Sequence, residues 1–311
     1  MNRRKGILLA AAAMLALVLS AAAVPAGSFS QTGAGQKSVK VSWSNPEDEY
    51  NIKVRSYQLQ WGKSSSSLTH TKTLSASERS SVITGLKPYS RYFVKVMCTY
   101  ANAYGSIYTD QYSSMYVGTA PGKVSKIKYD FCSNQKGFRI AWTKPSGDGY
   151  GANYQVMLRD LNKKTIRNVK TSSTYSFSNT CFIKKVCKAQ IRAFLEINGK
   201  KYYGPWTYKS VVPQPIISLD KTKTYIRNGK LTLRWSKVYG AQKYSIFVSK
   251  KPDSGFRCVR TVKGNVLGTT LSKFGTESYK NNTYYYVQIV TRSAIGSAVR
   301  NYGAKVRLSV Y

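Results

Sequence analysis

One short pattern, found three times, constrains the fold of this chain more than any other feature. Apolar and mostly polar residues alternate over five positions and end in tryptophan, in Val39-Lys40-Val41-Ser42-Trp43, Phe138-Arg139-Ile140-Ala141-Trp142 and Leu231-Thr232-Leu233-Arg234-Trp235. Such alternation predicts a β-strand with one face in a core. The tryptophans lie 99 and 93 residues apart, which is the spacing of whole domains rather than of solenoid repeats.

Two more alternating segments follow each tryptophan. The first opens with tyrosine in every copy, at residues 57–61, 154–158 and 244–248. The second comes 33 to 41 residues later, at residues 92–96, 187–191 and 285–289. Alternate positions share one face of a strand, so three segments per copy predict half a core in a fixed register. The aromatic core positions are Trp43, Trp142, Trp235, Tyr57, Tyr154, Tyr244, Tyr92 and Tyr285.

Each copy resembles a fibronectin type III domain. Residues 86–92 spell Leu-Lys-Pro-Tyr-Ser-Arg-Tyr, which is similar to the Leu-x-Pro-x-x-x-Tyr corner of that family, and residues 102–105 are similar to its Asn-x-x-Gly stretch. Residues 198–206, Asn-Gly-Lys-Lys-Tyr-Tyr-Gly-Pro-Trp, have a spelling common in repeats of exported bacterial proteins. The resemblance covers residues 37–311 and implies seven-stranded, two-sheet sandwiches of about a hundred residues.

We therefore expect an all-β chain of three tandem immunoglobulin-like (fibronectin type III) β-sandwiches after an N-terminal signal peptide. The expected parts are a signal peptide (1–26), a linker (27–36) and three modules (37–120, 121–213 and 214–311). The junctions at residues 119–123 and 212–215 are short and contain proline, which predicts limited hinging.

The first residues have the three parts of a secretory signal. Basic residues 3–5 precede an apolar run at 6–19, and small residues follow up to Gly27. Cleavage after Ala23 or Ala26 satisfies the small-residue rule, whereas an uncleaved N-terminal anchor is the alternative. Both predict a protein that is secreted or associated with the cell surface.

Five cysteines, an odd number, exclude a dense disulfide scaffold. Cys181 and Cys187 stand where the other copies have Leu86 and Tyr92, or Tyr279 and Tyr285. The resemblance implies that this corner brings the two positions together, so we predict a Cys181–Cys187 disulfide; two buried thiols are the alternative. Cys98 is expected in a core, and Cys132 and Cys258 near module edges.

The formal net charge is +37, and it is unevenly placed: +5 over residues 27–121, +14 over 122–213 and +15 over 214–311. Such a field favours anionic partners, with salt-sensitive affinity. Basic and aromatic residues interleave in the second copy, which favours a binding role for its cations. Protection of sheet edges by lysine is the plainer alternative. The candidate polyanion-binding residues are Lys184, Lys185, Lys188, Arg192, Lys200, Lys201, Lys250, Lys251, Arg257 and Arg260.

Groups able to do catalysis are scarce. The chain has one histidine, His70, in a Ser/Thr-rich segment, and twelve carboxylates, of which Glu47, Asp48 and Glu49 are the one cluster. That cluster is either a weak Ca²⁺ site or a solvated acidic loop, and it lacks EF-hand ligand spacing. No phosphate loop, nucleophile elbow or CxxC pair is present, so we predict no catalytic, metal-binding or cofactor-binding residues.

These features predict a non-catalytic extracellular binding or spacer protein that associates electrostatically with anionic cell-wall or surface polymers. Partners are an anionic polymer, a glycan or a protein; nucleic acid ranks lower because the chain is exported, and membrane contact would come only through an uncleaved signal segment. One alternative is a carbohydrate-binding accessory protein that uses exposed Tyr and Trp, whose binding would tolerate salt. Another is an enzyme of unrecognised type.

Overall fold

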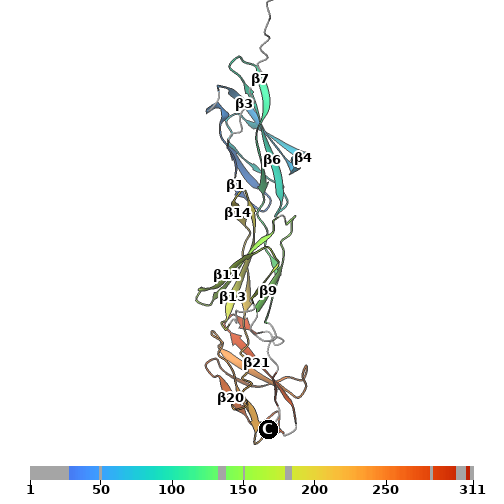
Figure 1. Ribbon diagram of the computed structural model, residues 1–311, viewed down its shortest axis with the longest axis vertical. Helices are drawn as coiled ribbons and strands as arrows, with labels where there is room; N and C mark the ends of the chain where they lie inside the picture. The colour runs from blue at the N-terminus through green and yellow to red at the C-terminus, as the bar shows by residue number, and fades with distance from the viewer. Residues whose placement is uncertain are drawn as a thin grey trace, which may run out of the picture. The chain divides into compact units, whose positions relative to one another are not determined.

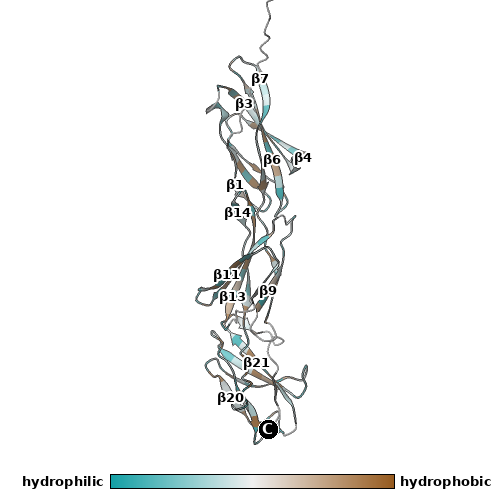
Figure 2. Cartoon of the chain, in the orientation of Figure 1, coloured by the Kyte–Doolittle hydropathy of each residue, from teal (hydrophilic) through white to brown (hydrophobic). Residues whose placement is uncertain are grey.

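The computed structural model describes residues 28–48, 51–131, 138–149, 151–178, 184–280, 283–298 and 306–308. In these residues the regular structure is β-strand, apart from the 3-10 helix η1 (Pro46–Asp48) (Figure 1). Both hydrophobic and hydrophilic residues occur along the strands (Figure 2). In this part of the chain no helix is long and apolar enough to cross a membrane. The predicted signal peptide, 1–26, lies outside the described residues.

Residues 29–118 contribute two sheets. The small sheet has the order β1-β2-β5, with β1 (Phe29–Ala34), β2 (Val39–Trp43) and β5 (Ser80–Ile83). The large sheet has the order β4-β3-β6-β7, with β4 (Ser67–Ser75), β3 (Lys53–Ser64), β6 (Arg91–Ala101) and β7 (Ile107–Gly118).

The second copy repeats this arrangement. Its small sheet has the order β12-β9-β8, with β12 (Tyr175–Ser178), β9 (Phe138–Thr143) and β8 (Ser125–Phe131). Its large sheet has the order β11-β10-β13-β14, and β15 also pairs with β13. The bounds are β11 (Thr165–Thr171), β10 (Asn153–Asp160), β13 (Cys187–Ile197), β14 (Lys200–Tyr203) and β15 (Thr207–Val211).

The third copy does the same. Its small sheet has the order β16-β17-β20, with β16 (Tyr225–Arg227), β17 (Lys230–Arg234) and β20 (Gly268–Leu271). Its large sheet has the order β19-β18-β21-β22, and β23 also pairs with β21. The bounds are β19 (Arg257–Lys263), β18 (Lys243–Ser249), β21 (Tyr285–Ser293), β22 (Gly296–Ser297) and β23 (Val306–Leu308).

In chain order, strands one, two and five of each copy form the small sheet, and strands four, three, six and seven form the large one. The seventh strand is split in two in the second and third copies. This repetition confirms the prediction of an all-β chain of tandem fibronectin type III-like sandwiches. The boundaries between the modules stay predictions.

The chain forms two compact units. One comprises Met1–Ser30, Ser42–Ser81 and Phe93–Met115, and the other Gln31–Val41, Val82–Tyr92 and Tyr116–Tyr311.

The repeated tryptophan packs edge-on against the repeated tyrosine in every copy. The ring centroids lie 5.4 Å apart in the Trp43–Tyr57 pair, 5.2 Å in the second copy and 5.7 Å in the third. All eight predicted core aromatics are buried. Such pairs stabilise by about 0.5–1.5 kcal/mol beyond the area they bury.

The tyrosine corner is present in the first and third copies. The hydroxyl of Tyr92 accepts a hydrogen bond from Lys87 N at 2.9 Å, and that of Tyr285 accepts one from Lys280 N at 3.0 Å. In the second copy Cys187 is buried, and Cys181 lies outside the described residues. The Cys181–Cys187 disulfide therefore stays a prediction.

The predicted linker at 27–36 is wrong, because β1 lies within it. Gln31 is buried there, and its side-chain amide donates to Gly118 O at 2.7 Å and accepts from Gly118 N at 2.9 Å. Most strands are recognised in a sequence by the apolar side chains that anchor them in a core at every second position. In β1 this anchor is the hydrogen-bonded amide of Gln31 instead. A strand spelled Phe-Ser-Gln-Thr-Gly-Ala has no such alternation, so its sequence resembles a linker.

Tyr89 belongs to the core of the second copy, although it precedes that copy in the chain. Its side chain is fully buried in a cluster that includes Trp142 and Tyr154. Its hydroxyl accepts from Asn153 N at 3.0 Å, and its carbonyl accepts from Gly149 N at 3.1 Å. The loop at 82–92 therefore completes a core built mostly from residues 124–211.

Candidate anion-binding surface

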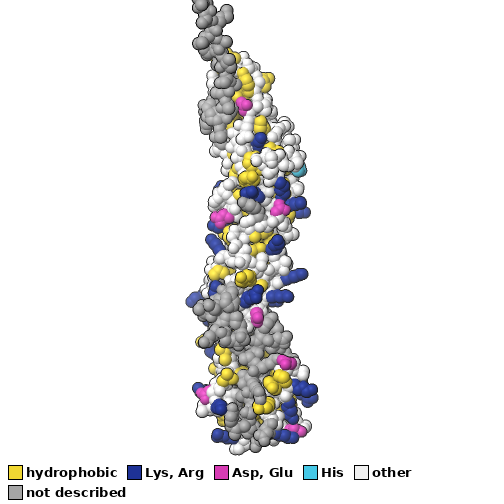
Figure 3. Space-filling view, turned by 45° about the vertical axis from the view of Figure 1, so that its right-hand side comes forward, with side chains coloured by type: hydrophobic (Ala, Val, Ile, Leu, Met, Phe, Trp, Pro, Cys, Tyr) yellow, Lys and Arg dark blue, Asp and Glu magenta, His cyan; other side chains and the backbone are white. Residues whose placement is uncertain are grey.

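The ten predicted cations are spread over five places in the second unit. They lie just before β13 (Lys184, Lys185), on β13 (Lys188, Arg192), on β14 (Lys200, Lys201), after β18 (Lys250, Lys251) and on β19 (Arg257, Arg260). All are exposed except Arg192, which is half-buried. On the face shown in Figure 3, Lys and Arg side chains outnumber carboxylates. Net charge alone does not say which of these cations are open to a partner.

Arg192 does not present an open charge. Its guanidinium carbon lies 3.6 Å from the ring centroid of Tyr203 and 4.3 Å from that of Trp206. Its Nε and Nη2 donate to Gln155 Oε1 at 3.0 and 2.8 Å, and Gln155 donates to Asn168 Oδ1 at 3.1 Å. Burial lowers the pKa of Arg192, which remains protonated at neutral pH. This side chain fastens β13 to β10, so much of its hydrogen-bonding capacity is used within the protein.

Two further predicted residues are held in ion pairs. The Nζ of Lys201 lies 3.4 Å from Oε1 of Glu196, its cross-strand neighbour on β13. The Nζ of Lys250 lies 3.4 Å from Oε2 of Glu277. The pKa of Glu277 is lowered, chiefly by a hydrogen bond from Lys280. Exposed pairs of this kind stabilise the fold little, but they neutralise part of the local charge.

Three cations outside the predicted set form a row across the large sheet of the third copy. Lys243 on β18 pairs in register with Lys263 on β19 and with Arg292 on β21. Directly opposed residues of antiparallel strands have Cβ atoms about 5 Å apart on the same face. All three are exposed, and Arg292 Nε donates to Ser245 Oγ at 2.8 Å. We call these three residues the cationic row.

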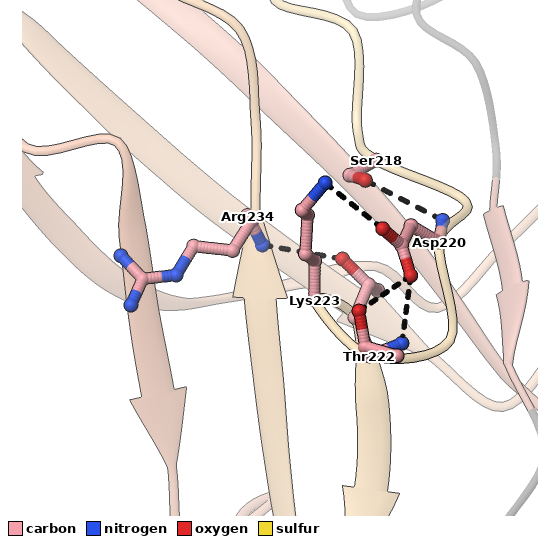
Figure 4. A network of polar contacts seen from close by, with 6 residues as sticks. Ser218, Asp220, Thr222, Lys223 and Arg234 are labelled. Carbon is pink, nitrogen blue, oxygen red and sulfur yellow. Dashed lines mark hydrogen bonds and ion pairs between the residues drawn. The ribbon is translucent and has the colours of Figure 1, made fainter.

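No carboxylate lies on the three strands that carry the cationic row. Asp220 of the same copy is already engaged (Figure 4). Its Oδ1 accepts hydrogen bonds from Thr222 N at 2.9 Å and from Thr222 Oγ1 at 2.6 Å. Its Oδ2 lies 2.9 Å from Lys223 Nζ in an ion pair. The hydrogen bonds from Thr222 and Lys223 hold the pKa of Asp220 well below its usual range. The row therefore faces solvent without an acidic neighbour on its own strands.

The remaining predicted residues are exposed, and two of them line a depression. Lys188 on β13 pairs in register with Arg159 on β10, which makes a second, smaller juxtaposition of cations. Arg257 and Arg260 line a hollow on the third copy together with Lys273.

His70 and Glu47, two of the scarce groups able to take part in catalysis or metal binding, make structural contacts. The ring of His70 stacks on Trp61 at 5.4 Å, and its Nδ1 lies 2.8 Å from Thr69 Oγ1. Glu47 Oε1 accepts from Val54 N at 2.6 Å; the Asp48 side chain and Glu49 lie outside the described residues. Among the residues described, no group of three His, Cys, Asp or Glu side chains is placed to hold a metal ion.

Comparison with known proteins bears on the first copy most directly. Residues 24–114 match the model of the fibronectin type III domain. No curated protein matches the chain significantly.

Two solved structures from chicken are similar to the chain. The CNTN1 FN1–FN3 domains have 15% sequence identity and a TM-score of 0.27, over 92% of this chain and 98% of that one. A two-domain fibronectin type III segment of tenascin has 12% identity and a TM-score of 0.33, over 60% and 98%. Scores this low carry no conclusion about function.

Proposed function

We propose that this chain, whose residues 24–114 match the model of the fibronectin type III domain, is an exported binding or spacer protein that associates electrostatically with anionic polymers at a cell surface. Domains of this family are typically non-catalytic binding or spacer modules, and they are common in extracellular and surface proteins. Specificity on such folds resides in surface sites rather than in the fold itself.

The cationic row is the observation that supports this proposal best. Like charges directly opposed on a sheet destabilise it, and no carboxylate on these strands offsets their repulsion. A polyanion lying across the strands would meet three positive charges in succession and relieve that repulsion. The interaction would weaken as salt screens the charges, over a Debye length of about 8 Å at physiological ionic strength.

The test measures binding of the full chain to heparin and to poly-L-glutamate across a salt series, with dextran as the neutral polymer. In the row variant, Lys243→Gln/Lys263→Gln/Arg292→Gln, affinity for both polyanions should fall about tenfold at low salt, from roughly 0.5 kcal/mol per charge. Dextran should not bind.

A matched control variant neutralises two lysines and one arginine that are exposed in the first copy, Lys40→Gln/Lys53→Gln/Arg55→Gln. It should retain affinity within about twofold. Equal losses in both variants would mean that net charge alone drives binding and that the row has no special part. Absence of polyanion binding at low salt would contradict the proposed function.

A carbohydrate-binding accessory role is the second candidate, supported by Tyr239. This ring is 51% exposed, it lines a depression of about 270 Å³ with Leu161 and Asn162, and the Nζ atoms of Lys185 and Lys237 lie 5.9 and 5.1 Å from its centroid. An exposed ring beside polar groups is suited to stacking on a sugar. Binding of a neutral glycan that survives high salt and is lost in Tyr239→Ala would favour this role.

A further inference from the structure

A depression of about 390 Å³ opens between the edge strands of the two sheets in the third copy. β19 is the outermost strand of the large sheet, and β20 is the outermost strand of the small one. Leu271, which is buried, and Val259, which is half-buried, contribute apolar surface to its lining. Pockets that hold small ligands typically begin at about 300 Å³, so one sugar-sized group fits.

Hydrogen bonds hold this depression in shape. Arg260 reaches from β19 to β20, where its Nη1 donates to Thr269 Oγ1 at 2.9 Å and to Thr270 O at 3.0 Å. Phe274 and Glu277 exchange backbone hydrogen bonds of 2.8 and 3.4 Å around Gly275, whose φ of 66° lies in the region that glycine favours. A ligand would therefore meet a site whose backbone is already in place.

Three cations and no carboxylate line the depression among the residues that the structure describes. Arg257 and Arg260 come from β19, and Lys273 follows β20. The acidic residue of the adjoining turn, Glu277, is occupied by Lys250 and Lys280 at 3.4 and 3.2 Å. Arg257 and Lys273 are therefore available to an anion from outside, and Arg260 offers the donors that Thr269 and Thr270 do not use.

We propose that this depression binds one anionic sugar unit, a pyranose that carries a carboxylate, sulfate or phosphate group. Guanidinium groups match the planar or tetrahedral oxygens of such anions, and the hydroxyl of Ser272 in the lining can donate to them. The apolar lining suits the carbon face of the sugar ring. This inference rests on the proposed function and names the unit of the polymer that would be recognised.

Cys258 provides a reporter inside the depression. Its side chain is exposed and lines the site. Cys98, in contrast, is buried, and burial raises the pKa of its thiol to about 11, so it should react slowly. The rate at which neutral iodoacetamide alkylates Cys258 is read by mass spectrometry of its peptide, which separates it from every other cysteine.

The full chain is alkylated with glucuronate, glucose 6-sulfate or glucose 6-phosphate present, and separately with glucose or inorganic phosphate. At a concentration about twice the Kd, at least one anionic sugar should slow alkylation of Cys258 roughly threefold. The three arms identify the favoured anionic group. Equal protection by glucose would overturn recognition of the anion, and equal protection by inorganic phosphate would overturn recognition of the sugar.

Two variants separate the site from general charge. Arg257→Gln/Lys273→Gln should raise the concentration for half-protection about fivefold. The matched control Arg227→Gln/Lys230→Gln, on the β16–β17 hairpin of the same copy, should leave it within about twofold. Each variant is compared with its own rate without ligand, so a changed thiol reactivity cancels.

Failure of this inference is distinguishable from failure of the proposed function. If no sugar protects Cys258 while the row variant still loses heparin affinity, the depression is not a binding site and the electrostatic association stands. If the site variant and its control shift half-protection equally, the anionic sugar is held by the overall field and the depression has no role.

Discussion

The large sheets of the second and third copies sit in parts of the chain with nearly equal charge, +14 and +15, but they arrange their cations differently. In the second copy, Arg192 packs against Tyr203 and Trp206 and is hydrogen-bonded to Gln155. In the third copy, Lys243 has a cation opposite it on each side, and the three strands that carry these cations contain no carboxylate.

Equivalent sheets can therefore use their charges in two ways: for cohesion in the second copy and, as we propose, for recognition in the third. A guanidinium whose donors and faces are satisfied within the protein stabilises the fold and has little left for a partner. Opposed cations without such partners weaken the fold slightly and attract an anion. Contacts, rather than net charge, therefore distinguish the cations that are engaged within the protein from those that we propose to bind a partner.

The largest expected effect comes from breaking the aromatic stack of the second copy. Trp206→Ala removes a half-buried ring from Arg192 and should lower the free energy of unfolding by about 2–4 kcal/mol. The control is Tyr208→Ala, which truncates a ring that is 59% exposed, and should cost less than about 1 kcal/mol. Urea denaturation measures both, and equal costs would mean that the stack contributes nothing particular.

The predicted Cys181–Cys187 disulfide would distinguish the corner of the second copy from the tyrosine corner of the third. Closing so short a loop should stabilise by less than the ~3 kcal/mol expected for a fifteen-residue loop. Mass spectrometry of a non-reducing digest should show the two cysteines in one cross-linked species, and a reductant should lower stability by that amount. Alkylation of both thiols without a reductant would show that the corner is held by packing alone.

Arginine neutralisation tests the two sheets against each other. Arg192→Gln should lower the free energy of unfolding by about 1–2 kcal/mol with little salt dependence, because it removes ring contacts and a hydrogen-bonded charge. Arg292→Gln should change it by less than about 0.5 kcal/mol and should stabilise at low salt, because it relieves repulsion. Denaturant titrations at low and high salt check this contrast, and a large loss in Arg292→Gln would break it.

The smallest effect concerns pH and the Asp220 network. The folded-state pKa of Asp220 is depressed by Thr222 and Lys223, so its contribution is present above the unfolded-state pKa, about 4, and is lost as pH falls toward the folded value. Asp220→Asn should therefore lower the melting temperature slightly at pH 6 and not at all at strongly acid pH. If the difference in melting temperature between Asp220→Asn and the wild type does not change with pH, the charge of Asp220 does not contribute to stability.

The strands that carry the cores could be predicted from sequence because their pattern is local. Trp142 and Tyr154 follow the two-residue period in their own segments, and burial of one face enforces that period in the fold. β1 was missed because Gln31, rather than an apolar side chain, anchors it to Gly118, 87 positions away in the chain. Hydrogen bonds at such a separation leave no periodic signal.

The proposed binding surface is harder to predict because it depends on the register between strands. Lys243, Lys263 and Arg292 are neighbours only once β18 is aligned with β19 and β21. Their alternation places each on the outer face, but no local pattern says which outer residues face one another. For Arg192 the difficulty is the opposite one, since the nearby Tyr203 and Trp206 resemble a binding patch in sequence and are its packing partners in the structure.

Tyr89 determines which residues must stay together when the gene segment for the second copy is duplicated or moved. A gene segment that begins at the predicted boundary, residue 121, would encode the second copy without the ring that fills part of its core. Removing a buried aromatic side chain typically costs 3–5 kcal/mol, a large share of the stability of a small domain. Duplication or shuffling of this copy would therefore have to carry residues 82–92 along, or replace the missing ring from its new neighbour.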